Sequence, residues 1–175
     1  MAQYTGPQPD CQALAQKYAA QYHIPPSLLY SLIIQESGCN PKATGSAGEE
    51  GLTQIIPGYH PVDQYGNKLN PFNPDQAVSY TAYLLKTYYD KTKSYADALW
   101  IYNAGSGNYD KGVLPSSTVG YIKSILARAG LPVDSPKAQA LGLLVQPPGL
   151  QLQDNQTKLQ QAIKLLEEIL NSESF

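Results

Sequence analysis

Residues 23–38, HIPPSLLYSLIIQESG, decide the fold because they contain a helix start, an apolar body and a helix stop. Prolines at positions 25 and 26 are typical of a first helical turn, and Gly38 is typical of the residue that follows a helix end. The body between them is almost fully apolar, which indicates a helix that is buried on most sides. We therefore expect a buried central helix whose last turn carries Glu36 and Ser37.

Apolar spacing on either side of this helix predicts a mainly α fold. Residues 10–22 place apolar side chains at spacings of four behind a possible N-cap, Asp10. Downstream, the same kind of pattern predicts three more helices, at about 74–89, 94–103 and 115–129. Residues 40–58 are rich in turn formers instead, so we expect a small hairpin or an irregular loop there that walls a cleft.

The composition and the periodicity of the sequence change after residue 130. Residues 131–155 hold four prolines and little helical period, which is typical of a linker or of an arm that lies on another surface. Residues 156–175 place leucine and isoleucine on one face, and so short a helix needs that face covered. We expect one domain over residues 1–130, then the arm, then an amphipathic C-terminal helix that packs back, self-associates or docks on another chain.

The composition restricts the kind of protein. Hydrophobic residues make up 42% of the 175 residues and charged residues 15%, which favours a folded, soluble domain without a membrane span. The net charge is -2 and there is no basic run, so a nucleic-acid partner is not expected. The first residues, MAQYTGPQPDCQ, lack the basic and apolar regions of a signal peptide, so either the precursor is trimmed or another route delivers the protein.

Cysteine and histidine residues are few. Cys11 and Cys39 either form one disulfide in an oxidising compartment or remain two thiols, and the sequence leaves both possibilities open. His23 and His60 are far apart and have no cysteine or carboxylate partner at ligand spacing. We therefore expect neither a metal site nor a cofactor.

Glu36 has the most distinctive chemical setting in the chain. A lone carboxyl group at the end of an apolar helix is partly desolvated, and desolvation raises its pKa toward the range that a glycosidase acid needs. A solvated glutamate at a helix end is the ordinary alternative. The motifs elsewhere in the chain decide between the two.

Three short motifs follow one another in a fixed order: ESG at 36–38, GLTQ at 51–54 and YNAG at 102–105. Together with the lead-in to the first motif, they resemble the soluble lytic transglycosylase family, which is related to goose-type lysozymes. The resemblance spans about a hundred residues, so it is more specific than any single motif. It implies a lysozyme-like helical domain with a small hairpin or irregular subregion near residues 45–57.

The resemblance also implies a reaction. Members of this family are lyases that cleave the β-1,4 bond between N-acetylmuramic acid and N-acetylglucosamine in peptidoglycan, usually leaving a 1,6-anhydromuramoyl end. Glu36 would protonate the bridging oxygen and then take a proton from the muramoyl C6 hydroxyl, which attacks C1 of the same sugar. Because the substrate supplies the nucleophile, the usual second carboxylate of a glycosidase is unnecessary.

Five further positions inherit supporting roles from the resemblance. Gln54 would hydrogen-bond the sugar near the cleaved bond, and Tyr102 would orient Glu36 or the substrate. Asn103 would brace its loop or contact sugar. Tyr121 either lines the cleft or is a core tyrosine, and Ser37 supports the helix end, since a nucleophilic serine would need a base beside it.

Some positions depart from the family pattern. Gly45 stands where serine is frequent, and Thr53 replaces the usual methionine. Glu49 and Glu50 occupy positions where small or neutral residues are commoner, and we expect them to be solvated loop charges. The alternative is that one of them faces Glu36 and activates water, so that the enzyme hydrolyses the bond as lysozyme-type muramidases do.

The biological setting has rival interpretations. A wall-binding module that has lost catalysis would lack the acid, and Glu36 is present. A structural component of a phage tail or a secretion machine that also carries the enzyme fits the arm and the C-terminal helix. We therefore expect a virion-associated or cell-envelope enzyme that acts on peptidoglycan glycan strands and locally opens the wall.

Overall fold

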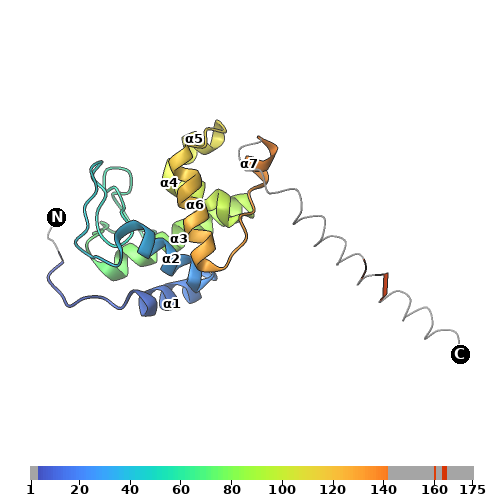
Figure 1. Ribbon diagram of the computed structural model, residues 1–175. Coiled ribbons are helices and arrows are strands. Elements are labelled where there is room, and N and C mark those ends of the chain that lie inside the picture. The colour runs from blue at the N-terminus through green and yellow to red at the C-terminus, as the bar shows by residue number, and fades with distance from the viewer. Residues whose placement is uncertain (1–3, 142–159, 161–162, 165–175) are drawn as a thin grey trace, which may run out of the picture.

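The computed structural model describes residues 4–141, 160, 163 and 164 of the chain (Figure 1). Over these residues the fold is mainly α, as predicted, and none of the described helices is both long and apolar enough to span a membrane. The helices of the described part are α1 (Cys11–Tyr22), α2 (Pro26–Ser37), α3 (Pro74–Thr92), α4 (Tyr95–Ala104), α5 (Ser106–Asp110), α6 (Ser116–Ala129) and α7 (Pro136–Ala140).

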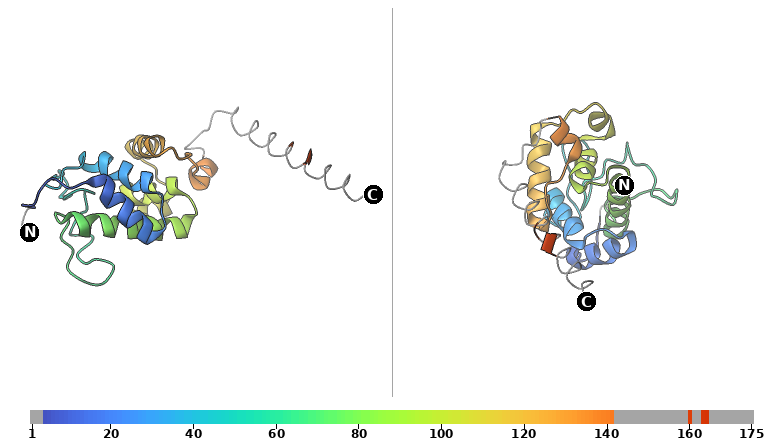
Figure 2. Two further views of the ribbon diagram at one scale, coloured as in Figure 1. Left: turned by 90° about the horizontal axis from the view of Figure 1, so that it is seen from below. Right: turned by 90° about the vertical axis from the view of Figure 1, so that its right-hand side faces the viewer.

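Helix α2 lies at the centre of the domain, with α1 and α6 packed against it and α3 and α4 completing the core (Figures 1 and 2). The predicted buried helix is confirmed, because Leu28, Leu29, Leu32 and Ile33 have no exposed surface. The helix begins behind Pro25 and ends at Gly38, whose left-handed backbone suits a residue without a Cβ atom. This ending leaves Glu36 and Ser37 in the last turn.

A long loop joins α2 to α3 and contains short antiparallel bridges, with no longer strand among the described residues. The predicted small hairpin or irregular region is therefore confirmed. At Gly51 the loop passes very close to the backbone of Pro71. The φ of Gly51 is +73°, and a Cβ atom there would lie 1.9 Å from the carbonyl oxygen of Pro71. Only glycine fits such a close approach of two backbone segments.

Two short helices, α5 and α7, are not predicted by the sequence. Gly105 and Gly107 indicate a helix end, whereas the chain turns at Gly105 and begins α5 directly. The segment that contains α7 is expected in the arm, whereas Leu131 and Val133 pack against the core and Ala138 is fully buried in it. Residues 131–141 therefore belong to the packed domain.

A buried carboxyl group, that of Asp97, joins these short helices to α4. Asp97 is 2% exposed, accepts a short hydrogen bond from the hydroxyl of Ser135 and another from the hydroxyl of Tyr109 at 3.2 Å. Burial raises its pKa, and the two hydroxyl donors oppose that rise. The remainder of the predicted arm and most of the predicted C-terminal helix lie outside the described residues, so their roles stay predictions.

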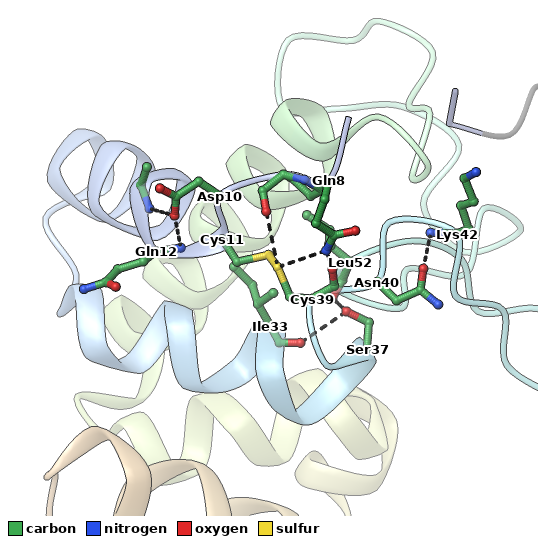
Figure 3. The surroundings of a disulfide bond; sticks show 12 residues. Gln8, Asp10, Cys11, Gln12, Ile33, Ser37, Cys39, Asn40, Lys42 and Leu52 are labelled. Carbon is green, nitrogen blue, oxygen red and sulfur yellow. Dashed lines mark hydrogen bonds between the residues drawn. A yellow bond between two sulfur atoms is a disulfide. The ribbon is translucent and has the colours of Figure 1, made fainter. Parts of the chain in front are cut away.

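The two cysteines form a disulfide, which resolves the two possibilities left open by the sequence (Figure 3). Cys11 opens α1 and Cys39 follows the end of α2, with their Cα atoms 6.1 Å apart. The bridge ties the start of α1 to the segment that leaves the helix of Glu36. A side-chain amide from Gln8 also donates to the carbonyl oxygen of Cys39 at 2.6 Å.

Candidate active site

Glu36 is a half-buried carboxyl group at the end of α2. Its pKa is raised from 4.5 to about 7, and burial is the largest cause. A hydrogen bond from Tyr121 lowers the pKa, while the charge of Glu49 raises it further. Glu36 can therefore carry a proton at neutral pH, which a solvated glutamate does not.

Tyr121 lies against Glu36 from the neighbouring helix α6. Its hydroxyl donates to Oε1 of Glu36 at 2.5 Å, and the side chain is buried. Burial and the charge of Glu36 raise the pKa of Tyr121 well above its usual range, so it remains a hydrogen-bond donor. The bond occupies Oε1 of Glu36, so Oε2 is the oxygen to which Tyr121 does not donate.

Replacing Tyr121 by phenylalanine is expected to raise the pKa of Glu36 above about 7, because the lost hydrogen bond favours the ionised form. The expected rise is about one pH unit. The measurement is an NMR titration of the Glu36 carboxyl carbon. Tyr102→Phe is the matched control, since its hydroxyl bonds elsewhere. A fall of the midpoint in Tyr121→Phe would show that the bond does not act as described.

Tyr102 fastens the loop after α2 to α3 and α4. Its hydroxyl donates to the carbonyl oxygen of Thr53 at 2.7 Å and lies 3.3 Å from the hydroxyl of Thr81. The charge of Glu36 contributes to raising the pKa of Tyr102, after burial, so the two side chains are close enough to interact. Tyr102 nevertheless has no hydrogen bond to Glu36.

Ser37 and Asn103 hold the elements that carry the site. The hydroxyl of Ser37 donates to the carbonyl oxygen of Leu52 at 2.8 Å and to that of Ile33 at 3.3 Å, which latches the loop onto the helix end (Figure 3). The side-chain oxygen of Asn103 accepts from the hydroxyl of Thr118 at 2.7 Å, which links α4 to α6. Both contacts support the geometry around Glu36.

Gln54 has a left-handed backbone with φ of 51°. Its side-chain nitrogen donates to the carbonyl oxygens of Gly51 at 2.9 Å and Ala43 at 3.3 Å, so it stabilises its own loop. Thr53, in place of the usual methionine, is fully buried and its hydroxyl points to the carbonyl oxygen of Ala77 at 3.5 Å. The polar group that this exchange adds to the core is therefore paired.

A cavity of about 510 Å³ opens beside these residues, between the loop after α2 and helices α3, α4 and α5. Gln54, Tyr102 and Asn103 line it, whereas Glu36, Ser37 and Tyr121 do not. Tyr102 lines the cavity and also lies near Glu36. The other lining residues are Ile55, Ile56, Tyr59, His60, Leu84, Tyr88, Ile101, Ala104, Gly105, Ser106 and Gly107.

Tyr59 and Tyr88, two aromatic residues that line this cavity, are missing from the sequence-based prediction. Tyr59 is 79% exposed in the structure. The signal that could have indicated it is a tyrosine in the turn-rich segment that follows the GLTQ motif. Tyr88 has no comparable signal, because its helical spacing is also that of a core residue. His60 contacts the hydroxyl of Tyr80 through Nδ1 at 3.0 Å.

The expectation that Glu49 and Glu50 are solvated loop charges is wrong, since both are half-buried. Oε2 of Glu50 is buried without a hydrogen-bond partner in the described part of the structure. The carboxylate of Glu49 accepts from the backbone N–H of Ala47 at 2.9 Å. Across the described ranges, no group of three or more histidine, cysteine, aspartate or glutamate residues is placed to hold a metal ion.

The fold and the site together define a helical domain in which Glu36, a carboxyl group with a raised pKa, lies near Tyr102, and Tyr102 in turn lines an aromatic cavity. Residues 13–122 match the family described as the Transglycosylase SLT domain. The chain belongs to this family.

Individual relatives agree with this assignment. A transglycosylase of Enterobacteria phage PRD1 is 27% identical over 124 residues, which cover 69% of this chain and 45% of the phage protein. The chain therefore spans about half the length of that relative.

Solved lytic transglycosylases share the fold. The 70 kDa soluble lytic transglycosylase Slt70 of Escherichia coli superposes with a TM-score of 0.58 at 28% identity, covering 67% of this chain and 23% of that one. An inactive mutant of the lytic transglycosylase Slt of Pseudomonas aeruginosa superposes with a TM-score of 0.61 at 19% identity, covering 77% of this chain and 25% of that one.

Proposed function

We propose that the protein is a peptidoglycan lytic transglycosylase that cleaves the bond between N-acetylmuramic acid and N-acetylglucosamine, with Glu36 as its acid and base. The observation that carries this proposal is the pKa of Glu36, raised to about 7 by burial in a domain of the SLT family. An acid whose pKa is near neutral can both deliver and recover a proton at neutral pH.

Glu36 would act in two steps. In the first, the proton on Oε2 passes to the glycosidic oxygen while the bond from that oxygen to C1 of the muramoyl sugar breaks. In the second, the C6 hydroxyl oxygen of the same sugar bonds to C1 and its proton passes to Glu36. Water is not consumed, Glu36 ends as it began, and the products are an anhydromuramoyl end and a free hydroxyl on the other sugar.

The surrounding residues would serve these steps without touching the transferred proton. Tyr121 holds Oε1 of Glu36, which leaves Oε2 for the substrate. The cavity lined by Gln54, Tyr59 and Tyr102 offers aromatic faces and polar groups, which suit sugar rings. Glycan strands would lie along this cavity.

Hydrolysis is the second candidate, favoured by the effect of Glu49 on Glu36. If Glu49 activates water, the released sugars carry reducing ends. The two reactions differ in product mass, because hydrolysis adds one water molecule.

Digestion of purified peptidoglycan, followed by mass spectrometry of the released muropeptides, tests the proposal. Anhydromuramoyl products are expected. Products with reducing ends would instead identify a muramidase. If the folded protein released no muropeptides, this result would contradict both reactions and favour a binding or structural role.

We also propose that the protein opens the wall locally as part of a phage particle. The similarity to the PRD1 transglycosylase supports this role, and docking through the predicted C-terminal helix over residues 156–175 would attach the enzyme. Immunoblotting of purified particles tests it. The chain is expected in the particles, and its restriction to the particle-free supernatant would contradict the role.

A further inference from the structure

Exposed aromatic side chains gather on one surface outside the cavity. Of the seven large hydrophobic side chains that the described residues expose, four lie within residues 59–65 and at position 83. We call this patch, made of Tyr59, Val62, Tyr65 and Tyr83, the tyrosine surface. Its loop stands out from the helices beside α3 (Figure 2). Exposed apolar side chains that are grouped in this way mark an interaction site, whereas isolated ones do not.

Ring contacts connect the tyrosine surface to the cavity. His60, which lines the cavity together with Tyr59, packs against Tyr80 with the ring centroids 5.5 Å apart. Tyr80 stacks on Tyr83 at 6.1 Å, and Tyr83 contacts Tyr22 of α1 edge-on at 6.2 Å. The aromatic side chains therefore continue without a break from the cavity, across α3, to α1.

A small hollow of about 150 Å³ lies at the far end of this aromatic run. Tyr65 and Tyr18 supply its aromatic wall. The other lining residues are polar and none is basic: Asp63, Gln64, Asp75, Gln76 and Ser79. Gln64 joins the hollow to the run, because its amide nitrogen donates to the hydroxyl of Tyr22 at 2.5 Å and to that of Ser79 at 3.1 Å.

This combination of groups suits an uncharged sugar chain. Tyrosine rings can pack on the C–H faces of sugars, while amide, hydroxyl and carboxylate side chains can bond to sugar hydroxyl and N-acetyl groups. The carboxylates in the hollow are fixed in place. That of Asp63 accepts from the backbone N–H of Tyr65 at 2.9 Å, and that of Asp75 pairs with Lys17 at 2.7 Å. A phosphate-bearing ligand would meet these carboxylates and no basic lining residue.

We propose that the tyrosine surface and the hollow beside it form a second glycan-binding site, which holds the part of the sugar strand that extends beyond the cavity. A strand bound at both places is held more tightly than by the cavity alone, because the second contact forms within the same complex. The inference rests on the proposed function for the identity of the glycan, but the test of binding requires no cleavage.

Binding is measured by surface plasmon resonance in the Glu36→Gln background, so that the strands stay intact. The probe is peptidoglycan glycan strands from which an amidase has removed the stem peptides. Tyr65→Ala and Tyr83→Ala should each raise the dissociation constant by about a factor of five, as expected for the loss of one ring contact. Tyr65 is 68% exposed, so its replacement leaves the fold intact. Tyr65→Phe keeps the ring and should bind nearly as tightly as the parent.

Tyr89→Ala is the matched control from the same helix. Tyr89 stacks on Tyr95 with the ring centroids 4.2 Å apart, and it lines neither the cavity nor the hollow. This variant should bind the strands as the parent does. An unchanged dissociation constant in both Tyr65→Ala and Tyr83→Ala overturns the proposal, as does an equal loss of affinity in Tyr89→Ala. Binding of the free stem peptides that Tyr65→Ala weakens to the same extent also overturns it, because the ligand is then a peptide.

The proposed function is tested separately, by the release of muropeptides from peptidoglycan. If the wild-type protein releases none while Tyr65→Ala and Tyr83→Ala weaken strand binding, the second site stands and the proposed function alone fails. If the wild-type protein cleaves peptidoglycan while both variants bind strands like the parent, the second site alone fails.

Discussion

Replacing Glu36 by glutamine is expected to lower the rate of peptidoglycan cleavage by a factor of about 1,000. Glutamine keeps the shape of the side chain and can accept the hydrogen bond from Tyr121, but it has no proton to give. The rate of muropeptide release measures the effect. Glu50→Gln makes the same chemical exchange on the neighbouring loop and should keep most of the activity. Cleavage by Glu36→Gln at the wild-type rate would remove Glu36 from the mechanism.

The same variant should change the pH dependence of stability. The pKa of Glu36 is about 7 in the folded protein against an ordinary value of 4.5, so the folded state keeps a proton that the unfolded state releases. Protonation of Glu36 therefore makes its full contribution to the free energy of unfolding of the wild-type protein below about pH 4.5, and this contribution is lost as the pH rises through about 7. After discounting for partial exposure, the loss is about 2 kcal/mol.

Glutamine does not titrate, so Glu36→Gln should escape this loss. Relative to wild type, the variant should gain about 2 kcal/mol in the free energy of unfolding between pH 4 and pH 8. Urea denaturation at both pH values measures it. A difference between the two proteins that does not change with pH would contradict the buried, protonated state of Glu36.

Removal of the disulfide is expected to have the second large effect. The bridge between Cys11 and Cys39 closes a segment with a sequence separation of 28 residues, and restriction of such a loop in the unfolded chain is worth about 3 kcal/mol. The double variant Cys11→Ala/Cys39→Ala should therefore unfold about 10 °C lower than wild type. Differential scanning calorimetry measures the shift.

Reduction supplies the control for this prediction. A thiol reductant should lower the melting temperature of the wild-type protein to nearly that of the double variant and should not affect the variant. If the wild-type protein melts at the same temperature with and without reductant, the bridge contributes nothing to stability in solution.

The central part of the fold can be predicted because local patterns determine it. The helix of Glu36 has its start, its apolar body and its stop within residues 23–38, and the structure places α2 there. Helices α5 and α7 have no such local signal. They are stabilised by Asp97, which receives hydrogen bonds from Tyr109 and from Ser135, 38 residues away. Neither the spacing of apolar residues nor helix propensity reveals contacts between residues so far apart in the chain.

The candidate site likewise has one part that the sequence predicts and another that it does not. Short motifs indicate Glu36, Gln54 and Tyr102 because each motif is contiguous in the chain. The hydrogen-bond partners of these residues are distant in the sequence and could not be predicted. Tyr102 donates to the carbonyl oxygen of Thr53 and not to Glu36, whereas Tyr121 donates to Glu36. The half-burial of Glu49 is hidden for the same reason, since charge in a glycine-rich loop ordinarily faces water.

The hydrogen bond between Tyr121 and Glu36 joins residues 85 positions apart and depends on α6 lying against α2. During synthesis, a nascent chain that ends before α6 already contains Glu36, Gln54 and Tyr102. Such a chain lacks Tyr121, the hydrogen-bond donor to Oε1 of Glu36, and it lacks the helix that packs against α2. The surroundings of the acid are therefore completed only when α6 has been synthesised, later than the three residues that the short motifs indicate.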